Sequence, residues 1–294
     1  MKSHALILWT VVTGLSLIGG LGMLVSGCGV LNPVAHPSAE GPGRLRWKDL
    51  GPTPLGEKGY TPQGMTWVDG CLLLANTWKN TKSRVYEMDP RTMRILGTFD
   101  MPAHAVHTSG LAYDGHDLWA VDYRSNRCYK IDLQSSFNTG EAHVLGSFAT
   151  GLKGTSACCF ISWEGEQRLV VSDFKHSRKT YIVRHEEALR HGTMDGQVVF
   201  AYTNQGFSQG LLWDGVYLYE SENRLGRDIL NAMDPVALKK TGSACQAIVR
   251  RFNAPGRGVE DLAWDGFHFY TSDEKSLRFY RAPLPATVRP LSLH

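Results

Sequence analysis

The sequence lacks a dense block of lysine and arginine residues, and its formal net charge at pH 7 is only +3. Proteins that bind nucleic acid usually carry a basic patch or stripe that contacts phosphates. We therefore expect no nucleic-acid partner. The H-E-x-x-H, P-loop and EF-hand motifs are also absent, so the sequence carries none of these local signatures of metal and nucleotide binding.

The sequence has no C-x-x-C pair, and a structural zinc site therefore has no support. Beyond Cys28 the number of cysteines is odd, so at least one thiol stays free unless it pairs between chains. Their spacing leaves the pairing open. These cysteines are Cys71, Cys128, Cys158, Cys159 and Cys245. The adjacent pair at 158 and 159 fits a vicinal disulfide, a reactive thiol pair or two small buried apolar side chains, and we favour the last.

An uncharged segment occupies residues 5–24, directly before Val25-Ser26-Gly27-Cys28. This tetrapeptide resembles a bacterial lipobox, which implies cleavage before Cys28 and lipidation of its thiol. The alternative is an uncleaved membrane anchor, because twenty apolar residues are long enough to span a bilayer. The small residues before the cysteine favour the lipoprotein. Either way, we expect the rest of the chain to lie outside the cytoplasm, in the cell envelope.

The sequence divides into four parts. Residues 1–27 are the expected lipoprotein signal peptide, and residues 28–44, rich in proline and glycine, read as a lipidated cysteine with a flexible tether. Residues 45–285 are the expected folded domain, and residues 286–294 the C-terminal tail. The lipid on Cys28 makes the membrane the first expected partner.

A pattern of about fifty residues repeats along the folded part. It appears in "GMTWVDGCLLLAN", "GLAYDGHDLWAVD", "FISWEGEQRLVVSD", "GLLWDGVYLYESE" and "DLAWDGFHFYTSD". Aligned on the aromatic residue before the turn, the anchors are Trp67, Tyr113, Trp163, Trp213 and Trp264. Each copy predicts a hairpin followed by one or two further strands.

Four short strands at this period are typical of a β-propeller blade. The fifth copy stops after three strands, at Ala282, and "LRWKDLG" at 45–51 is a strand without a partner. We therefore predict an all-β fold, a five-bladed propeller in which the N-terminal strand completes the last blade. Six blades are the alternative, but a sixth anchor is missing.

Residues that recur in every copy are best explained by structure, because five catalytic sites in one domain are implausible. The anchors should pack between blades. An acid or amide recurs nine or ten residues after each anchor, and four of the copies have an arginine five residues later. We expect these acids and arginines to hold the turn between the second and third strands.

The residue four before each anchor should lie where the chain enters the innermost strand, at the mouth of the central channel. These residues are Gln63, Ser109, Cys159, Gln209 and Glu260. All but Cys159 can offer an oxygen ligand or a hydrogen bond. We expect Gln63, Ser109, the nearby His107 and Glu222 to contact a ligand at this mouth.

A second column, two residues before the repeated acid, holds Leu74, Ala120, Val171, Glu220 and Thr271. Glu220 is its only ionisable member. Burial and the neighbouring Glu260 should raise its pKa, which suits a general acid or base. The alternative is a salt bridge from Glu220 to Arg224 or Arg227.

The segment His104-x-x-His107 could contribute to a metal site, but no third ligand is evident. We expect no cofactor and no bound metal. Calcium is weakly supported, because Glu260 is the only carboxylate among the mouth residues.

"FSQGLLWDGVYLYES" (207–221) resembles the F-T-Q-G-L and L-Y-E-S-T-G segment of the bacterial and plant glutamine cyclotransferases, which are five-bladed propellers. The resemblance implies that Glu220 occupies their acidic catalytic position and that Gln209 matches their glutamine. Such enzymes convert an N-terminal glutamine to pyroglutamate with release of ammonia. The sequence departs from the family pattern at Glu222-Asn223, where a Thr-Gly would be expected.

Other stretches resemble other propellers. "AVDYRSNRCYKID" is similar to NHL repeats, and "VEDLAWDG" is similar to gluconolactonase-type propellers, which bind a divalent cation. Because no complete catalytic constellation is visible, we expect a binding or scaffold module for a peptide, small molecule or protein at the channel mouth. A cyclotransferase-like enzyme using Glu220, with Gln209 and Glu260 nearby, is the first alternative. A cation-dependent lactonase is the second.

Overall fold

The computed structural model describes residues 43–54, 59–223 and 228–284. The expected signal peptide with Cys28, Arg224 and Arg227, and the C-terminal tail lie outside the described residues. Within the described ranges, no helix is both long enough and apolar enough to cross a membrane.

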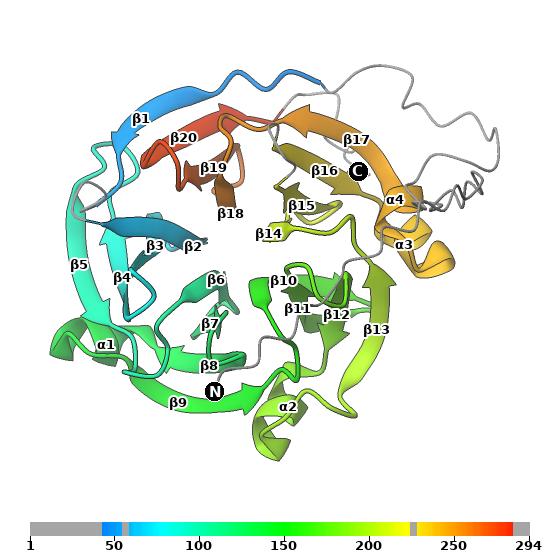
Figure 1. The fold of residues 1–294 in the computed structure, drawn as a ribbon, viewed down its shortest axis with the longest axis horizontal. Helices are drawn as coiled ribbons and strands as arrows, with labels where there is room; N and C mark the ends of the chain where they lie inside the picture. Colours follow the sequence, from blue (N-terminus) through cyan, green and yellow to red (C-terminus); the bar gives the residue numbers. More distant parts are fainter. Residues whose placement is uncertain (1–42, 55–58, 224–227, 285–294) are drawn as a thin grey trace, which may run out of the picture. The chain divides into compact units, whose positions relative to one another are not determined.

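Five four-stranded antiparallel sheets lie around a common axis as the blades of a β-propeller (Figure 1). Blade 1 comprises β2 (Tyr60–Val68), β3 (Cys71–Trp78), β4 (Lys82–Met88) and β5 (Ile95–Asp100). Blade 2 comprises β6 (Thr108–Tyr113), β7 (Leu118–Asp122), β8 (Arg127–Asp132) and β9 (His143–Ala149). Blade 3 comprises β10 (Thr155–Trp163), β11 (Glu166–Asp173), β12 (Lys179–Val183) and β13 (Val198–Thr203). Blade 4 comprises β14 (Ser208–Trp213), β15 (Leu218–Glu222), β16 (Ile229–Met233) and β17 (Ile248–Asn253). The predicted five-bladed propeller is confirmed.

Blade 5 joins the two ends of the chain. It contains β18 (Val259–Trp264), β19 (His268–Asp273) and β20 (Arg278–Pro283), and its outer strand is β1 (Lys48–Pro52). β1 pairs antiparallel with β20, and the Arg278 guanidinium donates to the Asp49 carboxylate. The predicted closure by the N-terminal strand is therefore confirmed.

The hydrophobic core is split into five clusters, one at each interface between adjacent blades. The aromatic anchors belong to these clusters. Trp67 of blade 1 stacks on Tyr270 of blade 5 at 5.5 Å, and Trp163 of blade 3 belongs to the cluster between blades 3 and 4. The expectation that the anchors pack between blades is confirmed.

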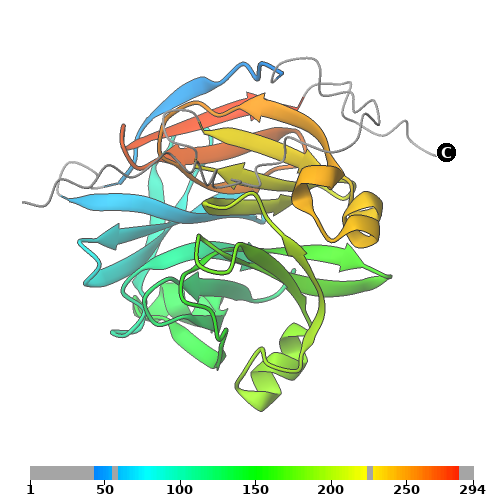
Figure 2. The ribbon, with the colours of Figure 1, turned by 45° about the vertical axis from the view of Figure 1, so that its right-hand side comes forward.

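Short helices lie between the third and fourth strands of three blades, which the repeat did not predict. They are α1 (Leu133–Thr139), α2 (His185–His191), and α3 (Pro235–Thr241) with α4 (Ala244–Ala247). They lie at the outer edge of the ring in both views (Figures 1 and 2). A Cβ on Gly97 of β5 would come within 2.9 Å of Phe137 in α1, and one on Gly146 of β9 equally close to Leu189 in α2. Each of these two helices thus covers the exposed edge strand of the preceding blade, as edge protection requires.

Glycines allow the innermost strands to approach one another closely around the axis. A Cβ on Gly64 would lie 2.9 Å from the backbone of Gly110, and one on Gly110 would lie 2.8 Å from the backbone of Ala157. A Cβ on Gly210 would lie 2.7 Å from the Asp261 Cα. The channel is therefore narrow at this level, and the blades meet backbone to backbone.

Candidate functional site

Each innermost strand carries a β-bulge near its start, on the side of the disc that we call the bulge face. The side chains at these bulges are those predicted for the channel mouth, except in blade 3. There the bulge lies between Thr155 and Ala157, so Ser156 occupies this position. Cys159 lies further along β10, paired with Val170. The assignment of Cys159 to the mouth was wrong.

The error arose from the length of the β10–β11 hairpin. Phe160 pairs with Leu169 in blade 3, as Tyr113 pairs with Leu118 in blade 2. The hairpin then continues to Trp163 before it turns. Phe160 is therefore the equivalent of the other anchors. Trp163 is a later residue that also precedes a turn.

The bulge-face side chains link neighbouring blades. The His107 Nε2 lies 2.9 Å from the Gln63 Oε1, and the Ser109 hydroxyl donates to the Thr155 carbonyl at 2.7 Å. The Gln209 amide donates to the Glu260 carboxyl at 3.2 Å. The structure thus joins Gln209 with Glu260 in one pair and Gln63 with His107 in another.

The two histidines of His104-x-x-His107 have different surroundings. His107 is half-buried and also contacts the Asn80 side chain, while His104 is exposed and lies against Tyr129. Burial lowers the pKa of His107, although the nearby Asp122 opposes the shift. Within the described ranges, no group of three or more His, Cys, Asp or Glu side chains is placed to hold a metal ion.

The repeated acid has the structural role expected of it. The Asp122 Oδ1 accepts from the amides of Arg124 and Ser125 in the turn after β7, at 3.0 and 2.7 Å. Asp173 and Asp273 make the same kind of turn contacts. These acids hold the turn between the second and third strands.

The repeated arginine does not pair with that acid. Arg84 instead binds Asp100, Arg127 binds Ser147 and Arg278 binds Asp49. In each case the partner lies on the outermost strand of the same blade. For these three arginines the expectation that they hold the turn was wrong, because their guanidinium groups reach outward to the outermost strand.

Glu220 lies in the middle of blade 4 and is fully buried. It pairs with Leu211 of β14 and with Asn231 of β16, and it shares a side of β15 with Leu218 and Glu222. Leu218 belongs to the hydrophobic cluster between blades 3 and 4. Glu220 therefore faces blade 3, whereas the Gln209–Glu260 pair lies towards blade 5.

Among the residues that the structure describes, neither carboxyl oxygen of Glu220 has a hydrogen-bond partner, and the buried hydroxyls of Ser208 and Tyr202 also lack one. Burial raises the pKa of Glu220 to about 8, and the negative charge of Glu222 adds to this rise. The nearby Ser208 hydroxyl opposes the rise, although its geometry is not that of a hydrogen bond. Glu220 is therefore mostly protonated at neutral pH. Glu222, and not Glu260, is the neighbouring carboxylate that matters.

The bulge face is acidic where blades 4 and 5 meet. Burial raises the pKa of Glu260 well above its ordinary value, and the charges of Glu274, Asp261 and Asp228 add to the rise. Burial likewise raises the pKa of Asp228 to about 6, although the Val259 amide donates to this carboxylate at 2.6 Å. A positively charged group placed here would relieve the repulsion among these carboxylates.

Asp261 is the residue that sequence reasoning missed. Its two carboxylate oxygens accept four backbone N–H groups from three neighbouring strands and its own: Met65 at 3.0 Å, Leu111 at 3.1 Å, Leu211 at 3.2 Å and Leu262 at 2.9 Å. Burial raises the pKa of Asp261, and the four amides oppose this. Four donors suit a carboxylate, which only accepts, better than a carboxylic acid, whose O–H would also need an acceptor.

Cys158 and Cys159 are buried free thiols, which agrees with the expectation of small apolar side chains.

A cleft of about 660 Å³ lies between blades 1 and 2 and is lined by Lys82, Asp100 and His104 among others. Glu220 and the Gln209–Glu260 pair do not line this cleft.

No protein-family model matches the chain, and no curated protein matches its sequence. Among solved structures, the fold is similar to that of Myxococcus xanthus glutaminyl cyclase, with a TM-score of 0.57 and 12% sequence identity, over 83% of this chain and 100% of that one. A Bacteroides caccae protein of unknown function gives a TM-score of 0.44 at 14% identity, over 67% of this chain and 68% of that one. At these identities the first likeness establishes a common β-propeller fold.

Proposed function

We propose that the protein is a lipid-anchored propeller of the cell envelope that binds the amine end of a peptide or small molecule on its bulge face. The observation that carries this proposal is the Gln209–Glu260 pair at the mouth between blades 4 and 5. Gln209 is half-buried and thus accessible to a ligand, while Glu260 and Asp228 are buried acids behind it. An ammonium group bound at Gln209 would be attracted by both carboxylates.

A cyclotransferase-like activity is the second candidate, and the buried Glu220 favours it. A carboxyl group with a pKa of about 8 is suited to exchange protons near neutral pH. In such a reaction the α-amine of an N-terminal glutamine attacks the side-chain amide, and the carboxyl group donates its proton to the leaving nitrogen, which departs as ammonia. The resulting carboxylate takes the proton that the attacking nitrogen releases. The common fold with a glutaminyl cyclase supports this candidate without identifying residues.

Binding is placed first because Glu220 is out of reach of solvent. A substrate could touch its carboxyl group only if the surrounding residues, which include Tyr202 of blade 3, moved. Gln209 needs no such movement. Binding at the mouth and catalysis at Glu220 are therefore separable properties.

The test uses a glutaminyl tripeptide and its N-acetylated form, with binding measured by isothermal titration calorimetry. We expect the free amine to bind, acetylation to abolish binding, and Glu260→Gln to weaken binding about tenfold, since a charge-assisted contact contributes about 1.5–3 kcal/mol. Glu141→Gln, an exposed glutamate of blade 2, is the matched control. Equal binding of both peptides, or of neither, contradicts the proposal.

Catalysis is tested in the same samples by mass spectrometry. Cyclisation lowers the mass of the peptide by that of one ammonia molecule. If the wild type forms pyroglutamate and Glu220→Gln does not, the second candidate is correct. Binding without this change leaves the protein as a binding module.

A further inference from the structure

The opposite mouth of the channel, where the first and second strands of each blade turn, has a different chemistry. We call this side the turn face. A cavity of about 150 Å³ opens there. One half-buried aromatic side chain from each innermost strand lines it, namely Trp67, Tyr113, Phe160, Trp213 and Trp264. The repeat thus places five aromatic rings around one opening.

The floor of this cavity is apolar but has a charge behind it. Leu111, Leu211 and Leu262 line the cavity, and the backbone amides of all three donate to the Asp261 carboxylate. A ligand in the cavity would therefore be separated from the buried Asp261 carboxylate by these leucine residues. In a medium of low dielectric constant, such a charge acts more strongly than it would through water.

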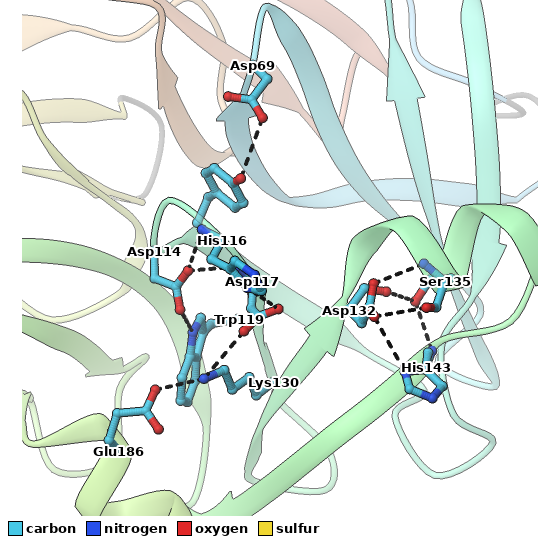
Figure 3. Close-up of polar contacts among 12 residues, drawn as sticks. Asp69, Asp114, His116, Asp117, Trp119, Lys130, Asp132, Ser135, His143 and Glu186 are labelled. Atoms are coloured by element: carbon cyan, nitrogen blue, oxygen red, sulfur yellow. Dashed lines mark hydrogen bonds and ion pairs between the residues drawn. The ribbon is translucent and has the colours of Figure 1, made fainter.

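Acidic residues also surround the mouth. The turn that follows each first strand contains Asp69, Asp114, Glu164, Asp214 or Asp265. Figure 3 shows two of them, Asp69 and Asp114. Asp114 accepts from the amides of His116 and Asp117 and from the Trp119 indole. The Tyr113 hydroxyl donates to Asp69 of the neighbouring blade at 3.5 Å. Asp114, Asp214 and Asp265 hold their turns by accepting backbone amides. Glu164 pairs with Lys239, so the other four carboxylates are the ones that add negative charge near the mouth.

We propose that the turn-face mouth binds an organic cation, such as a quaternary or alkylated ammonium group. Aromatic faces attract such cations, and Trp does so best. The cavity matches the size of one that accommodates benzene, and a tetraalkylammonium head group is similarly compact. Apart from Thr66, Cys159 and the Tyr113 hydroxyl, the lining consists of aromatic and aliphatic groups, which do not supply the set of oxygen ligands that a metal ion needs. The site lies on the other face from Gln209 and does not depend on the function proposed above.

The decisive experiment compares two probes of the same shape. Choline and 3,3-dimethylbutan-1-ol differ in the charge of the head group, and binding of each to the full chain is measured by isothermal titration calorimetry. We expect choline to bind about ten times more tightly, as a cation–π contact with additional negative charge predicts. Equal affinity would show that charge is not recognised, and absence of choline binding would overturn the site altogether.

A pair of variants locates the binding. Trp213→Leu removes one wall of the cavity and should weaken choline binding at least several-fold, whereas Trp78→Leu, an exposed tryptophan at the end of β3 on the other face, should leave it unchanged. Equal effects of the two substitutions would mean that choline binds elsewhere. Both proteins are first checked for a wild-type melting transition. The comparison of the two probes on the wild type stands even if Trp213→Leu does not fold.

Discussion

The buried carboxyl group of Glu220 should make the stability of the protein depend on pH in a way that its substitution removes. Its pKa is about 8 in the folded protein, against an ordinary value of 4.5. Below pH 4.5 the group is protonated in both the folded and the unfolded chain and contributes nothing. Between pH 4.5 and 8 the unfolded chain releases the proton while the folded protein keeps it. Stability therefore falls as pH rises, and the fall ends above pH 8.

The size of the effect follows from linkage. Each pH unit in this window costs about 1.4 kcal/mol, so Glu220 lowers the free energy of unfolding by about 3 kcal/mol at pH 7 and about 5 kcal/mol at pH 9. Glu220→Gln has a similar shape and does not titrate. The difference in unfolding free energy between the variant and the wild type should therefore rise by these amounts from pH 4.5 upwards.

Urea denaturation followed by tryptophan fluorescence at pH 4.5, 7 and 9 measures this difference. The exposed Glu141→Gln should give a curve parallel to that of the wild type. If Glu220 instead forms a salt bridge with an arginine, its substitution will reduce stability most at pH 7, which is the opposite sign. A difference that does not change with pH would refute the reasoning about burial.

Three further outcomes are expected. Asp261→Asn should lower the free energy of unfolding by about 3 kcal/mol, since an amide cannot accept from all four backbone donors, and urea denaturation with exposed Asp195→Asn as control measures this. Gly110→Ala should cost about 2–3 kcal/mol by overpacking against Ala157, and a wild-type urea midpoint would contradict the close approach of the blades. Cys28→Ser should abolish metabolic labelling with an alkynyl fatty acid and release the protein from membranes, whereas persistent labelling would exclude Cys28 as the lipid site.

The sequence predicted the architecture well because a propeller is built from near-identical units. Each Asp-Gly or Glu-Gly turn between two strand-like runs marks a blade, and the unpaired strand at 45–51 indicates closure. The helices were missed because they lie between the third and fourth strands, where the blades differ. Three blades, for example, carry a left-handed glycine there as a stop signal, namely Gly140, Gly192 and Gly242, whereas residues 89–94 of blade 1 contain no glycine.

The site was only partly predictable, for two physical reasons. The anchor of blade 3 was placed at Trp163 because a longer hairpin carries a second aromatic residue before the turn. Sequence also cannot tell which side of a blade a residue faces, so Glu220 and Glu260 were expected to be neighbours although they lie on opposite sides of blade 4. Asp261 could have been found by the same reasoning that found Glu220, since it replaces the glycine of blades 1, 2 and 4.

The position of Asp261 has a consequence for the whole channel. Its carboxylate draws the backbones of Met65, Leu111 and Leu211 to the axis, at the level where glycines already let the strands meet. This level separates the bulge face from the turn face, so a ligand at one mouth cannot pass to the other. The two mouths nevertheless share one charge, because Asp261 contributes to the raised pKa of Glu260 and lies behind the aromatic cavity. A cation bound at the turn face should therefore lower the pKa of Glu260 and, through it, alter amine binding at Gln209.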